Sequence, residues 1–246
     1  MDGRVNVARP PEVWLGVSTP EASRDDDHLA VETSTARILA LPDGSVRLSH
    51  QCPTCGATDH GRPELRSTHA GPGPGALPLT VSLSRTDGGS FWAVASGADA
   101  LGIDLESTTA VARAPIDSVA FTADELADLE RGAAARDVDH LELRTAAWTI
   151  KEALLKAAGT GLRADPRALR LTWAPRSAPP PVPRPGVDTL DPPWEPFPAF
   201  HLEAVPPGSA IDPSRTHLRA FTRHTPHGTL VAAVAVVTDL APRLHR

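Results

Sequence analysis

Two acidic residues, Asp104 and Glu106, are two residues apart in a segment, 101–106, where apolar and acidic side chains alternate. A period of two is typical of a strand with one buried face, so we expect the apolar residues in the core and both carboxylates together on the other face. Side chains two residues apart on a strand lie roughly 6 to 7 Å from each other. A single divalent cation can bridge two carboxylates at that spacing.

A second group of charged residues lies in a predicted helix that ends before Gly159. Either Asp137 or Asp139 can cap the start of this helix, and Gly159 suits the left-handed position after its last turn. Apolar residues recur at helical spacing and predict a buried stripe. They are Leu143, Ala147, Ile150, Leu154 and Ala157 or Ala158.

The opposite edge of the helix carries Trp148, Glu152 and Lys156 at four-residue intervals, with Lys151 beside them. One carboxylate and two ammonium groups are therefore expected on one rigid surface. A Glu–Lys pair at this spacing is also an ordinary surface ion pair that stabilises a helix by about 0.2–0.5 kcal/mol. The acidic strand upstream favours a functional site over that simpler interpretation.

Together the two stretches resemble the signature motifs of the phosphopantetheinyl transferases, in particular the surfactin-synthetase-activating type. Gly102-Ile103-Asp104-Leu105-Glu106 resembles the family's Gly-hydrophobic-Asp-hydrophobic-Glu strand. Trp148-Thr149-Ile150-Lys151-Glu152-Ala153, followed by Lys156, resembles its Trp-x-x-Lys-Glu-Ala/Ser-x-x-x-Lys helix, and Gly159-Thr160-Gly161-Leu162 continues that motif. A weaker resemblance extends over roughly 52–173.

The resemblance implies an α+β fold of two similar α/β subdomains related by a pseudo-twofold axis, each a small, mainly antiparallel sheet packed on helices. It divides the chain into 1–100, on the coenzyme A nucleotide side, and 101–246, with the metal and catalytic motifs. The family has a short form that trimerises and a long form that fuses two halves. A length of 246 residues fits the fused form, hence a monomer.

The implied reaction transfers 4′-phosphopantetheine from coenzyme A to a serine of an apo acyl or peptidyl carrier protein and releases adenosine 3′,5′-bisphosphate. Asp104, Glu106 and Glu152 offer three hard oxygen ligands, which suit Mg²⁺. By resemblance, Glu152 is also the general base. Lys156 neutralises the leaving bisphosphate, and Lys151 contributes to phosphate binding. The pathway that the carriers serve, whether fatty-acid, polyketide or peptide synthesis, stays open.

The nucleotide side departs from the family pattern in places. Gly61-Arg62-Pro63 resembles the family's Gly-Lys-Pro turn, so Arg62 is a candidate coenzyme A contact. Ser82 is another, because Val81-Ser82-Leu83-Ser84 stands where relatives have hydrophobic-Ser-His-Ser. The histidine that contacts the 3′-phosphate in the family is Leu83 here, and Arg62 or Arg85 is a possible substitute. Only Arg24 and Arg37 remain of the family's basic helix near the start.

Two cysteines occur in His50-Gln51-Cys52-Pro53-Thr54-Cys55-Gly56. Cys-x-x-Cys is a common zinc knuckle, but a closed site needs four ligands and the chain has no second cysteine pair. Two of His50, His60 and His69 would have to complete the site. We therefore favour a tight turn with two thiols, or a disulfide, over structural zinc or thioredoxin-like redox chemistry.

Composition and patterning place the other elements. Alternating or continuous apolar runs predict strands at 13–17, 79–85, 91–96, 169–173, 199–205, 217–223 and 229–237. A capping box of Thr122 and Glu125 predicts a helix to about Arg131. The acidic run 25–27 indicates a solvated helix start.

The proline-rich stretch 174–198 predicts an extended loop, which we interpret as a spacer and not as a ligand for a partner domain.

The whole chain narrows the class of protein. A hydrophobic fraction of 41% is enough for a core, and a net charge of −6 argues against nucleic-acid binding. The sequence has no apolar run of membrane-spanning length and no signal-like start, so we expect a cytoplasmic location without a membrane partner.

Two other functions fit the same residues. A Mg²⁺-dependent pyrophosphate hydrolase acting on a coenzyme A-like nucleotide would use the same carboxylates and release phosphopantetheine to water. A non-catalytic interaction module would rest on the cysteine knuckle and the proline tract, with the acidic strand as plain surface.

Overall fold

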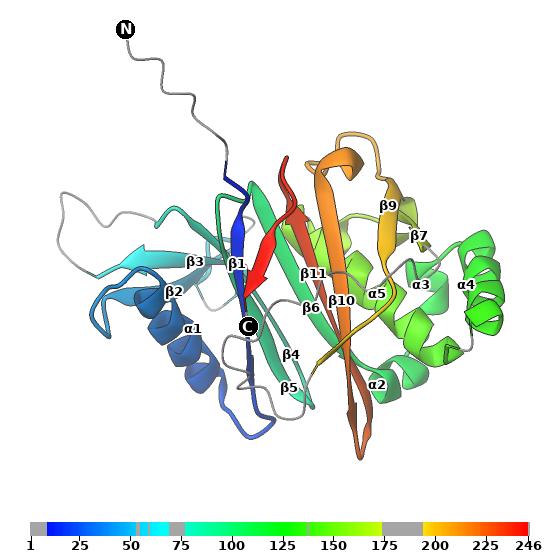
Figure 1. Ribbon diagram of the computed structural model, residues 1–246, viewed down its shortest axis with the longest axis horizontal. Helices are drawn as coiled ribbons and strands as arrows, with labels where there is room; N and C mark the ends of the chain where they lie inside the picture. Colours follow the sequence, from blue (N-terminus) through cyan, green and yellow to red (C-terminus); the bar gives the residue numbers. More distant parts are fainter. Residues whose placement is uncertain are drawn as a thin grey trace, which may run out of the picture.

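The computed structural model describes residues 9–52, 55–58, 60–68, 77–136, 138–173 and 194–245. Two four-stranded sheets lie side by side in it, with helix α1 beside the first sheet and helix α5 beside the second (Figure 1). The strand orders are β12-β1-β5-β4 and β6-β11-β10-β8. Every strand pairing is antiparallel except that of β12 with β1. The prediction of a mixed α/β fold with small antiparallel sheets and helices is confirmed.

The first half of the chain contains one sheet, one helix and one hairpin. These elements are β1 (Glu12–Ser18), α1 (Arg24–Ile38), β2 (Val46–Gln51), β3 (Arg62–Ser67), β4 (Leu79–Thr86) and β5 (Gly89–Ser96). Strands β2 and β3 form a separate two-stranded sheet.

The second half contains the corresponding elements and additional helices. Its strands are β6 (Ala100–Ser107), β7 (Arg170–Trp173), β8 (Glu195–Pro196), β9 (Phe200–Ala204), β10 (Thr216–Thr225) and β11 (Gly228–Val237). Its α-helices are α2 (Thr108–Arg113), α3 (Asp117–Ala120), α4 (Ala123–Arg136) and α5 (His140–Ala157). Three short 3₁₀ turns are η1 (Gly161–Arg163), η2 (Pro166–Ala168) and η3 (Pro213–Arg215).

The two halves repeat one order of elements. Each begins with a strand and has a two-stranded sheet, β2-β3 or β7-β9, before its last two sheet strands, and the spatial orders β1-β5-β4 and β6-β11-β10 correspond. Among the described residues, the second half differs in having four α-helices in place of one and in having β8 between β7 and β9. The halves are not independent, because a single apolar cluster includes Leu15 and Phe91 of the first sheet with Ile103 and Leu230 of the second. The last strand, β12 (Arg243–His245), also departs from the predicted division at residue 100, since it pairs with β1 of the first sheet.

All eight strands expected from the sequence, the acidic strand included, are present, with bounds that match or differ by a few residues. The capping box of Thr122 and Glu125 is formed, but α4 continues to Arg136 and not Arg131. One expectation was wrong: Asp27, in the acidic start of α1, is buried and accepts a hydrogen bond from Ser90 Oγ at 2.6 Å. Residues 174–193 of the proline-rich stretch lie outside the described residues. Strand β8, which falls within the same stretch, lies at the edge of the second sheet.

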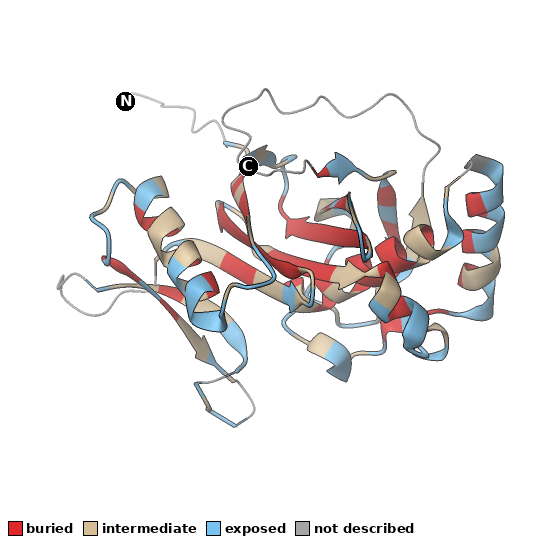
Figure 2. Cartoon of the chain, turned by 90° about the horizontal axis from the view of Figure 1, so that it is seen from below, coloured by how far each residue is buried: buried red, intermediate tan, exposed pale blue. Residues whose placement is uncertain are grey.

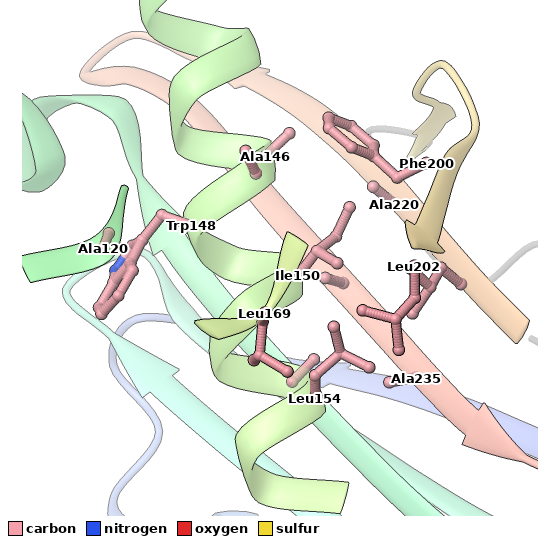
Figure 3. Packing of buried hydrophobic residues seen from close by; sticks show 14 of the residues in the cluster. Ala120, Ala146, Trp148, Ile150, Leu154, Leu169, Phe200, Leu202, Ala220 and Ala235 are labelled. Atoms are coloured by element: carbon pink, nitrogen blue, oxygen red, sulfur yellow. The ribbon is translucent and has the colours of Figure 1, made fainter. Parts of the chain in front are cut away.

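Helix α5 packs on one face of the second sheet, as the apolar stripe predicted. The side chains of Ile150 and Leu154 point toward Leu202 and Ala235, while Trp148 lies on the opposite edge of the helix (Figure 3). Asp139 caps its first turn, and Gly159 has the expected left-handed backbone, with φ of +69°. Figure 2 shows buried residues concentrated on the central strands and the inner faces of the helices.

Gly102 lets α5 rest directly on β6. A Cβ atom at this position would lie 1.8 Å from the backbone oxygen of Ala153 and 2.5 Å from the backbone nitrogen of Ala157. Because Gly102, Asp104 and Glu106 share one face of the strand, the helix is brought close to the two carboxylates. The glycine of the motif is therefore needed for packing.

We expect Gly102→Ala to lower the free energy of unfolding by about 1–3 kcal/mol, because an added methyl group pushes two pieces of backbone apart. Chemical denaturation of the parent and the variant measures the change. A variant as stable as the parent would show that α5 adjusts to the methyl group without cost, and that the close contact is not required.

Candidate active site at the junction of the two sheets

The neighbouring edges of the two sheets are β4 and β6, and side chains connect them. Ser82 Oγ accepts a hydrogen bond from the backbone nitrogen of Ile103 at 3.0 Å, and Ser84 Oγ donates one to Asp104 Oδ1 at 2.7 Å. Ser82 is buried and braces β6, which differs from the coenzyme A contact expected of it. Ser84, two residues along the same strand, was not predicted as a site residue, although a period of two would have placed it beside Ser82.

Asp104 is the centre of the cluster. Its carboxylate is buried, and Oδ1 also accepts a hydrogen bond from Lys156 Nζ of α5 at 2.7 Å. The other oxygen, Oδ2, is buried without a hydrogen-bond partner in the described part of the chain. A buried anionic oxygen in this state is costly, and it is an acceptor that a cation or a bound water can satisfy.

Glu106 and Glu152 extend the cluster from β6 and α5, and both are half-buried. Trp148 Nε1 donates a hydrogen bond to Glu106 Oε1 at 3.3 Å. Burial raises the pKa of Glu106 to about 7, and the charge of Asp104 adds to that effect. The pKa of Glu152 is also raised to about 7, by burial first and then by Asp104, against the opposing effect of Lys156. Three carboxyl groups thus share a space that contains one ammonium group.

This donor set fits Mg²⁺ as the implied metal. All three side chains supply hard oxygen ligands, one oxygen of Asp104 lacks a partner, and the mutual repulsion of the carboxylates would be relieved by a cation. Among the described residues, the three carboxylates do not bring one oxygen each within 4.8 Å of one another. Mg²⁺ tolerates that spacing because it usually keeps several of its waters and takes only one or two carboxylates directly.

Lys151 lies elsewhere, which corrects the phosphate role expected for it. Its ammonium group is fully buried and donates hydrogen bonds to Glu125 Oε2 at 2.9 Å, to the Ala120 oxygen at 2.8 Å and to the Pro166 oxygen at 3.1 Å. Burial lowers the pKa of Lys151, and Glu125 opposes that shift. The group ties α5 to α3, α4 and η2 and is shielded from ligands.

The sequence contained a signal for this position. Lys151 follows Leu143 and Ala147 at intervals of four, so it continues the buried stripe and not the edge that carries Glu152. One residue along a helix is a rotation of about 100°. That rotation is enough to separate the two charged residues onto different faces.

Arg62 reaches the end of α5. It is exposed, and its Nη1 lies 3.8 Å from where a Cβ on Gly159 would be, three residues beyond Lys156. Leu83 packs against the apolar cluster of the first half, and Arg85 is engaged by Asp27 and the Ala22 oxygen. Of the two cations considered as substitutes for the family histidine, Arg85 is engaged by Asp27, whereas Arg62 lies beside Gly159 at the end of α5.

A cavity of about 750 Å³ lies apart from this cluster, between β1, α1 and the β10–β11 turn. Its described lining includes Trp14, Gly16, Arg37 and Trp92 but none of the three carboxylates. The lining also includes the basic side chains of Arg223, His224 and His245, but this cavity is separate from the candidate metal site.

Comparison with protein families gives one match. Residues 100–191 match the model of the 4′-phosphopantetheinyl transferase superfamily, and this stretch contains both β6 and α5. The match supports a transferase that moves phosphopantetheine, with coenzyme A and carrier proteins as its general partners. A search of the curated proteins finds no match. No helix in the described residues is long and apolar enough to cross a membrane.

In metal-free buffer, we expect the free energy of unfolding to fall as the pH rises from about 4.5 to about 7. The pKa values of Glu106 and Glu152 are raised to about 7 in the folded chain, so that chain binds more protons than the unfolded one over this range. The protonated carboxyls contribute their full stabilisation below the ordinary glutamate pKa of 4.5. This contribution is lost as the pH rises to the folded-state pKa of about 7. Thermal unfolding at several pH values, with a chelator present, measures the change.

Added Mg²⁺ should raise the melting temperature more at the upper end of this pH range than at the lower end, because only ionised carboxylates bind it well. The double variant Glu106→Gln, Glu152→Gln is the control for other titrating groups. It should show a flatter pH dependence and little response to Mg²⁺. The same pH dependence in parent and variant would contradict the assignment of these two groups.

The two lysines of α5 should respond differently to truncation. We expect Lys151→Ala to lower the free energy of unfolding by about 3–5 kcal/mol, because Glu125 is left buried without its partner. Lys156→Ala should cost less, since its side chain is 31% exposed and Asp104 keeps the hydrogen bond from Ser84. Urea denaturation of both variants measures the difference, and equal losses would contradict the structural role given to Lys151.

Proposed function

We propose that the protein is a Mg²⁺-dependent 4′-phosphopantetheinyl transferase that uses coenzyme A to modify a serine of an apo carrier protein. The observation that carries the proposal is the cluster of Asp104, Glu106 and Glu152 with Lys156, built where β4, β6 and α5 meet. The surfactin-synthetase-activating type is supported by the repeated order of elements in one chain. That repeat is what a pseudo-twofold axis between two fused halves would produce.

The reaction is attack of a serine hydroxyl on the β-phosphate of the coenzyme A pyrophosphate, so positioning and charge neutralisation are the main tasks. Asp104, Glu106 and Glu152 would hold Mg²⁺, which neutralises pyrophosphate charge when bound. Lys156 is held at the cluster by Asp104 and lies partly open to solvent, where it can stabilise the leaving bisphosphate. We assign the nucleotide contact to Arg62, whose guanidinium lies beside Gly159 at the end of α5.

Glu152 is proposed as the general base. Its carboxylate makes no hydrogen bond within the described part of the chain. The carboxylate is therefore available to accept a proton from the serine, directly or through a water. Its place on a rigid helix, one turn before Lys156, keeps the base and the leaving-group cation at a fixed spacing.

Mass spectrometry of apo carrier proteins incubated with coenzyme A and Mg²⁺ tests the proposal. Asp104→Ala and Glu106→Ala should lose most activity and regain part of it at high Mg²⁺, because they weaken metal binding. Glu152→Gln should lose about a hundredfold or more without such rescue, because it also removes the base. The exposed Glu130→Gln on α4 is the matched control and should remain fully active.

Near-parental rates for all three site variants would refute the assignment of the site. The same experiment separates the rival functions. Phosphopantetheine released to water without a carrier would indicate a pyrophosphate hydrolase, and no turnover of coenzyme A with any carrier would favour an interaction module.

We expect the protein to bind the 3′-phosphate of coenzyme A weakly. Leu83 offers no hydrogen bond where the resemblance implies a histidine, and a charge-assisted bond of about 1.5–3 kcal/mol is missing. We expect KM values for coenzyme A and its 3′-dephospho analogue to differ by less than about tenfold. A strong preference for coenzyme A that disappears in Arg62→Ala would instead show that Arg62 has taken over the contact.

A further inference from the structure

The loop between β2 and β3 brings two cysteines and a histidine together. Cys52 follows β2 directly, Cys55 lies in the turn, and His60 precedes Gly61 at the start of β3. One ligand atom from each of the three lies within 4.8 Å of the other two. Cys55 Sγ is 3.3 Å from His60 Nε2, and no disulfide joins the cysteines.

The backbone of the loop builds this arrangement. The Cys52 nitrogen donates a hydrogen bond to the Ala57 oxygen at 2.8 Å, and the Gly56 nitrogen donates one to the Cys52 oxygen at 2.9 Å. At the other end, Gly61 has a φ of +105°, and a Cβ there would lie 2.5 Å from the Gln51 oxygen. The two ends of the loop therefore pass each other at backbone contact, which places His60 next to Cys52.

We propose that Cys52, Cys55 and His60 bind Zn²⁺. Bonds of about 2.3 Å to sulfur and about 2.0 Å to nitrogen put neighbouring tetrahedral donors roughly 3.4 to 3.8 Å apart, close to the sulfur–nitrogen distance found here. Two thiolates and an imidazole are the donors that zinc prefers and that Mg²⁺ does not. Cys55 and His60 are exposed, so a metal ion and a fourth ligand, such as water, have room to approach.

The geometry selects His60 from the three histidines that the sequence offered. The ring of His50 stacks on that of His28, with centroids 5.1 Å apart, and His50 does not belong to the cluster. His69 lies outside the described residues. The sequence disfavoured zinc because a closed site needs four ligands and the chain has no second cysteine pair. The hairpin formed by β2 and β3 supplies the third ligand by carrying His60 back to Cys52.

The metal would act as a brace and not as a catalyst. It closes the loop between Gln51 and Arg62, which are paired across β2 and β3. Only Gly61 separates His60 from Arg62, the cation that lies beside the end of α5. Because Zn²⁺ would bind the folded hairpin and not the unfolded chain, its binding would stabilise the folded hairpin. The three ligands lie on the β2–β3 hairpin and the carboxylates on β6 and α5, so the site is distinct from the one proposed for Mg²⁺.

Metal analysis of the full-length protein, purified under reducing conditions without added metal, tests the proposal. We expect about one zinc per chain. The variants Cys52→Ser with Cys55→Ser, and His60→Asn, should fall to background. His50→Asn is the matched control and should keep its zinc. These readouts do not involve phosphopantetheine transfer, so they stand or fall independently of the proposed function.

Chelation of the parent protein provides a second measurement that needs no variant. Removal of zinc should lower the melting temperature, and stoichiometric Zn²⁺ should restore it; Co²⁺ in its place should give a thiolate charge-transfer band that the cysteine double variant lacks. No zinc in the parent, together with no response of the melting temperature to zinc or chelator, would overturn the proposal. Loss of zinc from His50→Asn would overturn the ligand set.

Discussion

Helix α5 rests on β6 because Gly102 has no side chain, and this contact sets the spacing between the two elements that carry the carboxylates. Asp104 Oδ1 then accepts a hydrogen bond from Lys156 Nζ at 2.7 Å. Burial first, and then the nearby charge of Asp104, raise the pKa of Glu152. A larger residue at position 102 would move the helix as a unit. All of the proposed chemistry therefore depends on one contact between a strand and a helix.

Two neighbouring charged residues of α5, Lys151 and Glu152, lie in different surroundings and have different roles. Lys151 is buried among Glu125 and backbone oxygens, and it holds α5 against the layer formed by α3, α4 and η2. Glu152 faces the half-open cluster on the other side. The buried ion pair fixes the rotation of the helix about its own axis, and that rotation directs Glu152 and Lys156 toward Asp104.

Local patterning predicted most of the elements, because each depends on periodicity within a few residues. The acidic strand, the capped helix and the apolar runs of β10 and β11 are of this kind. Contacts between distant residues could not be read in the same way. Ser84 meets Asp104 only because β4 and β6 are neighbouring edges, and Arg85 is withdrawn by Asp27, 58 residues away. The sequence offered three histidines as ligands beside the cysteines, and only the β2–β3 hairpin distinguishes His60 from the other two.

The repeated strand order gives each position of β6 a counterpart in β1. Asp104 pairs with Ala233 and Gly16 with Trp92, each four residues before the end of its partner strand, so Gly16 stands where Asp104 does. Ser18 likewise corresponds to Glu106, and the cavity beside α1 occupies that side of the first half. Strand β6 thus carries the acidic pair, and the corresponding positions of β1 carry none. If the proposed transferase acts through this one acidic cluster of the described residues, its rate should saturate with donor hyperbolically, without cooperativity between the halves.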